Sequence, residues 1–216
     1  APGVNTTLDD LRRRFNTLAA NGAFAAVPVL AYETRPFSGV ETTDLESLIE
    51  HRRSVRSFQD LPVDRASLEA AMHLAVHAPS ACNRLPYRFI LLDQRGLIDA
   101  VGGLAGGTAG WLDNIPCLVV VVGDWSYYSD RNDRHTPYID SSFAVIQLLL
   151  KLEKDGMGGC VINWKNSQDN DQKLRNLLPL KAWEQAITLV AVGHPETAEV
   201  PMSIKKDKTS VLSWNS

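Results

Sequence analysis

The chain has 216 residues, of which 44% are hydrophobic, so it can bury one sizeable core and need not be divided into two large domains. Its net charge of -3 and its lack of a long basic stripe argue against nucleic acid as a partner. The apolar runs are far too short to span a bilayer, so we do not expect a membrane protein.

The first part of the chain, residues 1–41, is expected to form one helix and an extended connector. Apolar residues recur at helical spacing over residues 7–18, and an Asn-Gly pair follows as a stop signal. Residues 23–41 contain prolines and show little periodicity. We expect this part to pack on the core or on a partner subunit, while residues 42–216 form the main domain.

A capping-box signature at residues 43–46 begins the next predicted helix. Leu45 and Ile49 belong to its apolar face, which we expect to be buried. The length of this pattern places Arg52 and Arg53 in the last turn of the helix.

The rest of the chain alternates between helices and strands. Asp64 begins an amphipathic helix that ends at Pro79, and a long helix stops near Gly156. The apolar residues that mark the long helix are Ile139, Phe143, Ile146 and Leu150. The predicted strands are residues 88–93, 117–123, 160–163 and 187–193. The second of these is almost continuously apolar, which is typical of a central strand, and the whole pattern predicts one α/β or α+β domain with a sheet covered by helices.

Two polar clusters flank the predicted helix that begins at Asp64. The first, RRSVRSF, contains three arginines within residues 52–56, and their planar guanidinium groups suit a phosphate dianion. The second, APSACNRLPYRF, places Ser80, Asn83 and Arg84 in a loop between two prolines, where they could bind a polar ring edge. Together they predict a site for a phosphorylated cofactor. The structural alternatives are arginines that only complement a helix end and an ordinary Asx or Ser turn.

The cysteines and histidines do not indicate a metal site. Cys82, Cys117 and Cys160 are widely spaced and form no C-x-x-C pair, so neither a disulfide framework nor a zinc site is predicted. The five histidines show no triad or ligand spacing. A reducing, cytoplasmic setting fits this pattern best.

Taken in order, these motifs resemble those of the nitroreductase family of flavoenzymes. The resemblance rests on the two polar clusters, on the glycine-rich turn at residues 156–160 and on VAVGHP at residues 190–195, and it covers roughly residues 45–206. It implies an α+β sandwich with a central, mostly antiparallel sheet flanked by helices. It also implies an intertwined homodimer with FMN in a groove at the subunit interface.

The resemblance further implies where FMN would lie. Arg52 and Arg56 would hold its phosphate or ribityl end, and Asn83 would reach the ribityl chain or the pyrimidine edge. The residues implied to bind FMN are Arg52, Arg53, Ser54, Arg56, Pro79, Ser80, Asn83, Ile162, Asn163, Trp164, Lys205 and Lys206. Pro79 and Ser80 would come from the partner subunit. No catalytic side chain is expected, because the flavin N5 carries the chemistry.

Several of these roles have a structural alternative. Trp164 is either a lid over the flavin ring or a core aromatic, and Lys205 and Lys206 are either a phosphate contact or a solvated pair. The glycines at 156–159 either set backbone N–H groups beside the flavin or only shape a helix exit. Residues 124–138 form either a mobile loop that selects the electron acceptor or a plain surface loop.

The resemblance implies an FMN-dependent oxidoreductase with a ping-pong cycle. NAD(P)H reduces the flavin, and a nitroaromatic, a quinone or a related conjugated acceptor then takes the electrons. Three departures from the family pattern bear on this cycle: Leu85 stands where Gln is common, Tyr87 stands where Trp is usual, and Gln147 of the long helix stands where Asn is frequent. The alternatives are flavin cleavage, dehalogenation, heterocycle dehydrogenation, or a flavin-binding protein without catalysis.

Overall fold

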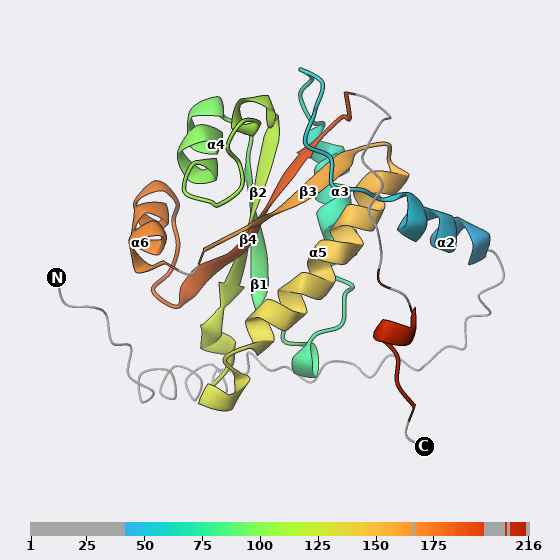
Figure 1. Ribbon diagram of the computed structural model, residues 1–216. Helices are drawn as coiled ribbons and strands as arrows, with labels where there is room; N and C mark the ends of the chain where they lie inside the picture. Colours follow the sequence, from blue (N-terminus) through green and yellow to red (C-terminus); the bar gives the residue numbers. More distant parts are fainter. Residues whose placement is uncertain (1–41, 166, 197–205, 207, 215–216) are drawn as a thin grey trace.

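A four-stranded antiparallel sheet with the strand order β1-β2-β4-β3 forms the centre of the molecule (Figure 1). The strands are β1 (Tyr87–Leu92), β2 (Cys117–Asp124), β3 (Gly158–Asn163) and β4 (Glu184–Gly193). They belong to a computed structural model that describes residues 42–165, 167–196, 206 and 208–214. The helix predicted at residues 7–18, the connector after it and Lys205 lie outside these residues. All four predicted strands are confirmed, with shifts of a few residues at their ends.

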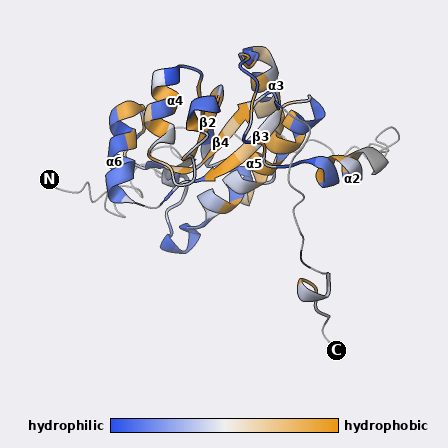
Figure 2. Cartoon of the chain, turned by 45° about the horizontal axis from the view of Figure 1, so that its top comes forward, coloured by the Kyte–Doolittle hydropathy of each residue, from blue (hydrophilic) through white to orange (hydrophobic). Residues whose placement is uncertain are grey.

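Strand β2 is central, as its composition predicts. The side chains from Cys117 to Val122 are at most 3% exposed, because helices cover both faces of the sheet there. Figure 2 shows the hydrophobic residues concentrated in the strands of the sheet and the inner sides of the helices. Strand β3, by contrast, is at the edge of the sheet, since only β4 pairs with it along its length among the described residues.

Helices α3 (Arg65–Ala75) and α5 (Thr136–Lys154) cover one face of the sheet, and α2 (Thr42–His51) lies beside α5 (Figure 1). Helices α4 (Arg95–Gly102) and α6 (Gln168–Leu177) cover the other face. Asp64 caps α3 as predicted, because its carboxylate accepts the backbone N–H of Ser67 at 2.8 Å. Neither α4 nor α6 was predicted, and the only buried side chain of α6 is that of Leu174.

Two expectations about α2 are wrong. The helix ends at His51, so Arg53 lies past its last turn, and Arg52 takes part in that turn only through its backbone N–H, which donates to the Leu48 carbonyl oxygen at 3.0 Å. Its apolar face is not buried by the part of the chain that the structure describes, because Leu45 and Ile49 are 50% and 54% exposed. The helix contacts little of the protein besides α5, which leaves this face without a partner among the described residues.

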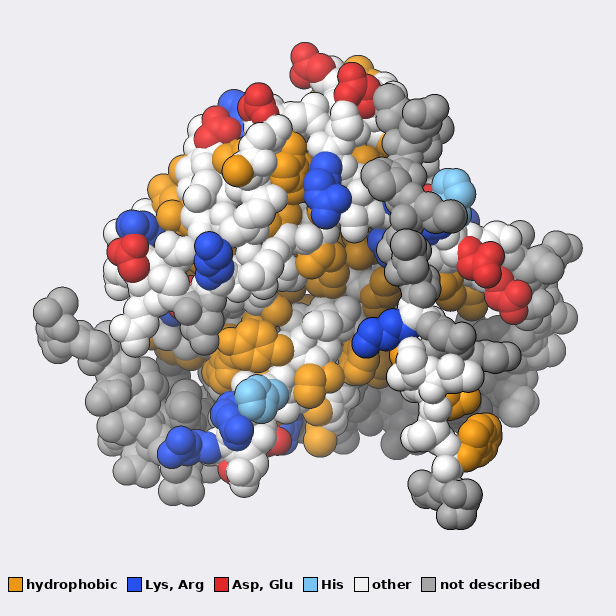
Figure 3. Space-filling view, in the orientation of Figure 1, with side chains coloured by type: hydrophobic (Ala, Val, Ile, Leu, Met, Phe, Trp, Pro, Cys, Tyr) orange, Lys and Arg blue, Asp and Glu red, His pale blue; other side chains and the backbone are white. Residues whose placement is uncertain are grey.

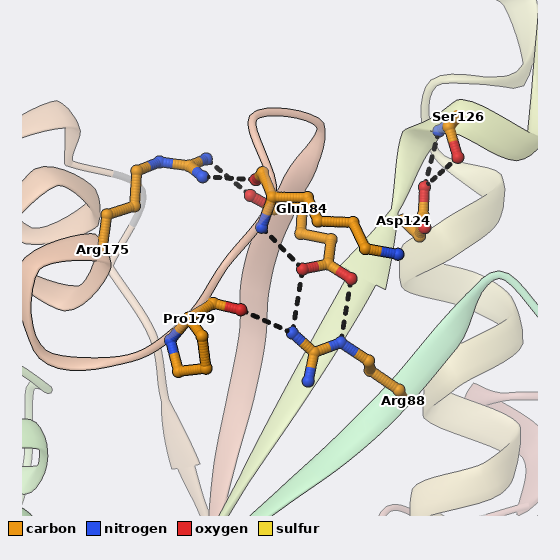
Figure 4. A network of polar contacts seen from close by, with 7 residues as sticks. Arg88, Asp124, Ser126, Arg175, Pro179 and Glu184 are labelled. Carbon is orange, nitrogen blue, oxygen red and sulfur yellow. Dashed lines mark hydrogen bonds and ion pairs between the residues drawn. The ribbon is translucent and has the colours of Figure 1, made fainter. Parts of the chain in front are cut away.

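An ion pair fixes one end of the sheet (Figure 4). The carboxylate of Glu184, which is 1% exposed, accepts two hydrogen bonds from Arg88, at 2.8 and 2.9 Å, and one from the backbone N–H of Lys181 at 2.8 Å. Arg88 also donates to the carbonyl oxygen of Pro179, and Arg175 donates to that of Glu184. Arg88 thus ties the loop between α6 and β4 to strand β1, and Arg175 ties the same loop to α6.

This network makes stability depend on pH. Burial alone would raise the pKa of Glu184, but the hydrogen bonds from Arg88 and Lys181 outweigh burial and lower it below its ordinary value. A depressed carboxyl pKa adds stability above the pKa of the unfolded chain, and this contribution is lost as the pH falls through the folded pKa.

Replacing Glu184 by Gln is therefore expected to lower the free energy of unfolding at pH 7 by about 2–3 kcal/mol, because Arg88 keeps part of its solvation but loses its charged partner. Urea unfolding at pH 7 and pH 3 measures the effect. The difference in the free energy of unfolding between the variant and the wild type should be smaller at pH 3 than at pH 7. A constant difference across this range would contradict the role of the carboxylate charge.

Candidate functional site

The arginine-rich segment after α2 lies directly on the edge strand β3. Ser54 forms a parallel bridge with Gly159, and the backbone N–H of Val55 donates to the Gly159 carbonyl oxygen at 3.2 Å. A Cβ atom on Gly158 would lie 2.7 Å from the side chain of Val55, so this approach requires glycine. Two of the predicted motifs, residues 52–56 and the glycine-rich turn, are therefore brought together.

The same segment also contacts the exit of strand β4. The backbone N–H of Gln59 donates to the carbonyl oxygen of His194 at 2.8 Å, and that of Glu196 donates to Ser57 at 3.0 Å. The side chain of Asn114 accepts from the N–H of Phe58 at 2.7 Å and donates to its carbonyl oxygen at 2.8 Å. The VAVGHP motif thus lies beside the arginine segment and the glycine-rich turn, and the side chain of Asn114 holds the backbone of the arginine segment at Phe58.

The three arginines of this segment differ in their surroundings. Arg53 donates to the carbonyl oxygens of Glu50 and Arg52, which fits the alternative of an arginine that complements a helix end. Arg52 is half-buried, and Arg56 is exposed with its guanidinium 5.9 Å from the centre of the Trp111 ring. Among the described residues, neither of them pairs with a carboxylate, so both can receive an anion.

Strand β3 presents backbone groups beside these arginines. In an antiparallel strand the N–H and C=O groups of one residue point to the same side, and alternate residues point to opposite sides. Because Gly159 faces Val55, the backbones of Val161 and Asn163 face the same open edge. Both residues are exposed at that edge.

Ile162 and Trp164 have their side chains in the core. They are 3% and 6% exposed, and the indole N–H of Trp164 donates to Asp171 at 2.8 Å. Of the two roles left open for Trp164, the structure favours the core aromatic. Ile162 also directs its backbone toward β4, by the same alternation, so any contact of Ile162 with a ligand at this edge would be indirect.

The second polar cluster forms a tight loop around the short helix η1 (Ala81–Asn83). Cys82, Asn83 and Leu85 have φ angles of 54°, 53° and 48°, in the left-handed region of backbone conformation that residues other than glycine rarely adopt. Ser80 closes the loop, since its hydroxyl accepts the backbone N–H of Leu85 at 3.1 Å. Leu85 packs on the core beneath α3 and α5, whereas Pro79 and Asn83 are exposed.

This loop and the arginine segment lie at opposite ends of α5. The backbone N–H of Ala81 donates to Asp140 near the start of that helix, while His51 next to Arg52 pairs with Glu153 near its end, at 2.6 Å. Asp140 and Glu153 are thirteen residues apart, which is about 20 Å along a helix. One chain therefore does not bring its two clusters together. Lys206 is exposed, and no described contact links it to either cluster.

A separate cavity of about 890 Å³ opens between the segment at residues 59–63, the end of β1 and α4. None of the predicted FMN-binding residues lines it. Its two arginines are engaged, Arg65 with Asp93 and Arg95 with Asp99 and backbone carbonyl groups. Cys117 lies at its wall, and burial raises the pKa of this thiol to about 12, so it is a poor nucleophile.

Two kinds of site are not found in the described part of the chain. No three His, Cys, Asp or Glu side chains gather there as they would around a metal ion. None of the described helices is both long and apolar enough to cross a membrane.

Comparison with known proteins decides the family. A model of the nitroreductase family matches residues 49–105 and 99–194. The chain belongs to the nitroreductase family. The α+β fold with an antiparallel sheet agrees with that assignment.

Relatives of known name agree with this membership. The chain is 25% identical over 166 residues to the FMN reductase (NAD(P)H) of Bacillus subtilis. The aligned part covers 70% of this chain and 65% of that protein. It is 26% identical over 149 residues to a protein of Archaeoglobus fulgidus provisionally named NADH dehydrogenase/NAD(P)H nitroreductase, with coverages of 69% and 84%. A crystal structure of a protein with that same provisional name from Parabacteroides distasonis superposes with a TM-score of 0.70 at 27% identity, covering 82% of this chain and 99% of that one.

Proposed function

We propose that the protein is an FMN-dependent oxidoreductase that receives electrons from NAD(P)H and passes them to a small conjugated acceptor such as a nitroaromatic or a quinone. Family membership and the names of the relatives support the cofactor and the reductant. The observation that carries the proposal is the contact between the arginine segment and β3, which places two cations without a described carboxylate partner beside open backbone N–H groups.

The chemistry of these groups fits FMN. Arg52 and Arg56 would bind the phosphate or ribityl end through charge-assisted hydrogen bonds. The N–H groups of Val161 and Asn163 on the open edge would stabilise negative charge on the ring system without a titrating side chain. Bound FMN supplies the hydride chemistry, and the chain itself binds the cofactor, orients it and limits its access to water. All three cysteines are free, which suits the reducing, cytoplasmic setting that is part of this proposal.

The proposed active unit is a homodimer with shared sites. Ile139, Phe143 and Ile146 of α5 are 52%, 44% and 43% exposed, and they give this helix an apolar surface that water solvates poorly, as Leu45 and Ile49 do for α2. Figure 3 shows hydrophobic side chains gathered in the hollow along the course of α5. A second copy on this surface would bury it, and would supply its own loop at residues 79–85, because in one chain this loop and the arginines are separated by about 20 Å of α5.

An anaerobic absorption spectrum tests the proposed half-reaction. The purified protein with FMN should show a bound flavin band, and this band should bleach when NADH or NADPH is added. Free FMN with the same nicotinamide is the control. A bound band that neither nicotinamide bleaches would contradict the reductant, and a protein that binds no FMN would contradict the cofactor.

A further inference from the structure

Asp140 is a buried carboxylate that the proposed function does not use. It lies near the start of α5 and is 3% exposed. Its Oδ2 atom accepts the backbone N–H of Ala81 at 3.1 Å and the hydroxyl of Tyr128 at 3.2 Å. A carboxylate away from water needs such donors, and here both donors belong to loops at the same end of the sheet.

The loop that contains Ala81 needs an external anchor. Three of its residues, Cys82, Asn83 and Leu85, have left-handed backbone conformations. Such conformations are unfavourable for residues with a side chain and persist only where the surroundings hold them. Within the loop, the Ser80 hydroxyl holds the N–H of Leu85, and from outside the loop Asp140 holds the N–H of Ala81.

Tyr128 extends this anchor, whereas Tyr87 lies near it without a hydrogen bond to it. Tyr128 is 5% exposed, and the guanidinium of Arg84 in the loop lies 5.0 Å from the centre of its ring. The Tyr87 hydroxyl is the only buried side-chain polar atom of the described residues without a hydrogen-bond partner. Burial, and then the negative charge of Asp140, raise the pKa of both phenols, so both hydroxyls are protonated at neutral pH, and that of Tyr128 donates to Asp140.

We propose that Asp140 is a positioning residue for FMN. It does not touch the cofactor. It holds residues 79–85 in the conformation that presents Pro79, Ser80 and Asn83 to the flavin, and through Tyr128 it fixes the segment after β2 against the same loop. The inference rests on the proposed function, because it concerns the loop assigned there to cofactor binding.

The test measures the dissociation constant of FMN by quenching of flavin fluorescence in four variants and the wild type. Asp140→Ala should weaken binding by about 10- to 100-fold, the range expected when two donors lose their shared acceptor in a buried place. Asp140→Asn should weaken it by less than about threefold, since the amide oxygen accepts the same bonds. Tyr128→Phe removes one of the two donors and should give an intermediate loss.

The matched control is Thr108→Ala. It removes another buried hydrogen bond from a side chain to the backbone, from Thr108 to the Gly102 carbonyl oxygen at 3.0 Å, behind the opposite face of the sheet. It should leave the affinity for FMN unchanged. Hydrogen exchange of the Ala81 amide provides a second readout, which should accelerate in Asp140→Ala and stay slow in the control.

The outcomes separate the two proposals. A wild type that does not bind FMN overturns the proposed function and this inference with it. A wild type that binds FMN, with Asp140→Ala binding equally well, overturns the inference alone. The inference also fails if Asp140→Asn binds FMN as weakly as Asp140→Ala does, because that result would indicate a role of charge. It fails as well if Thr108→Ala loses as much affinity for FMN as Asp140→Ala does. If Asp140→Ala does not fold, Tyr128→Phe decides, and unchanged affinity in that variant overturns the inference.

Discussion

Replacing Arg52 and Arg56 together by alanine is expected to raise the dissociation constant of FMN at least about 100-fold, since two charge-assisted hydrogen-bonding groups contribute about 1.5–3 kcal/mol each. Arg56 is exposed, so the lower end of the range applies to it. The effect on folding should be small, because neither guanidinium pairs with a carboxylate among the described residues. Titration of the apoprotein with FMN, followed by flavin fluorescence, measures the loss.

The control for this double variant is Arg65→Ala combined with Lys173→Ala. It also removes two positive charges, from exposed ion pairs with Asp93 and Asp169 on other parts of the surface. It should bind FMN as the wild type does, apart from a small effect of net charge that salt screens. Full flavin occupancy in the Arg52 and Arg56 variant would show that the phosphate is held elsewhere.

Placing a carboxylate on the apolar surface of α5 is expected to abolish the proposed homodimer. Phe143 is 44% exposed in the single chain, so Phe143→Asp should cost the monomer little, whereas an unpaired charge buried in an interface costs several kcal/mol. Sedimentation velocity should show a shift from dimer to monomer. The same variant should lose FMN, because the two clusters of one chain lie about 20 Å apart along α5 and each proposed site takes its loop from the other copy.

Leu177→Asp is the matched control for this second prediction. Leu177 is 38% exposed on α6, behind the opposite face of the sheet, so the substitution has the same chemistry outside the proposed interface. The control should remain a dimer and retain flavin. A Phe143→Asp variant that stays dimeric with bound FMN would place the interface on another surface.

The sequence predicted the elements whose signals are strong and local. The apolar run of β2, the Asp64 cap of α3 and the length of α5 are confirmed, because each depends on residues that are neighbours in the chain. Helix α6 was missed because its single buried residue, Leu174, gives no periodic pattern. The apolar face of α2 was correctly seen but wrongly expected to be buried within one chain, since periodicity identifies a face and not its partner.

The candidate site was predicted only in part. The motifs indicated which residue types gather near residues 52–56 and 79–85, but the buried role of Trp164 and the engagement of Arg53 by carbonyl groups became visible only in the fold. Asp140 was missed altogether. A carboxylate placed early in a long apolar helix was the available signal, and it did not show which loop the carboxylate would hold.

The sequence by itself determined the family, the order of the elements and the kinds of side chain in each motif, because all of these are written in short stretches of chain. Only the tertiary structure decided that the arginine segment lies on Gly159, that α5 separates it from the loop at residues 79–85, and that Asp140 anchors this loop. The physical reason is that each of these contacts joins residues about 60 to 100 positions apart, and packing of the whole core selects such contacts, which no local periodicity encodes.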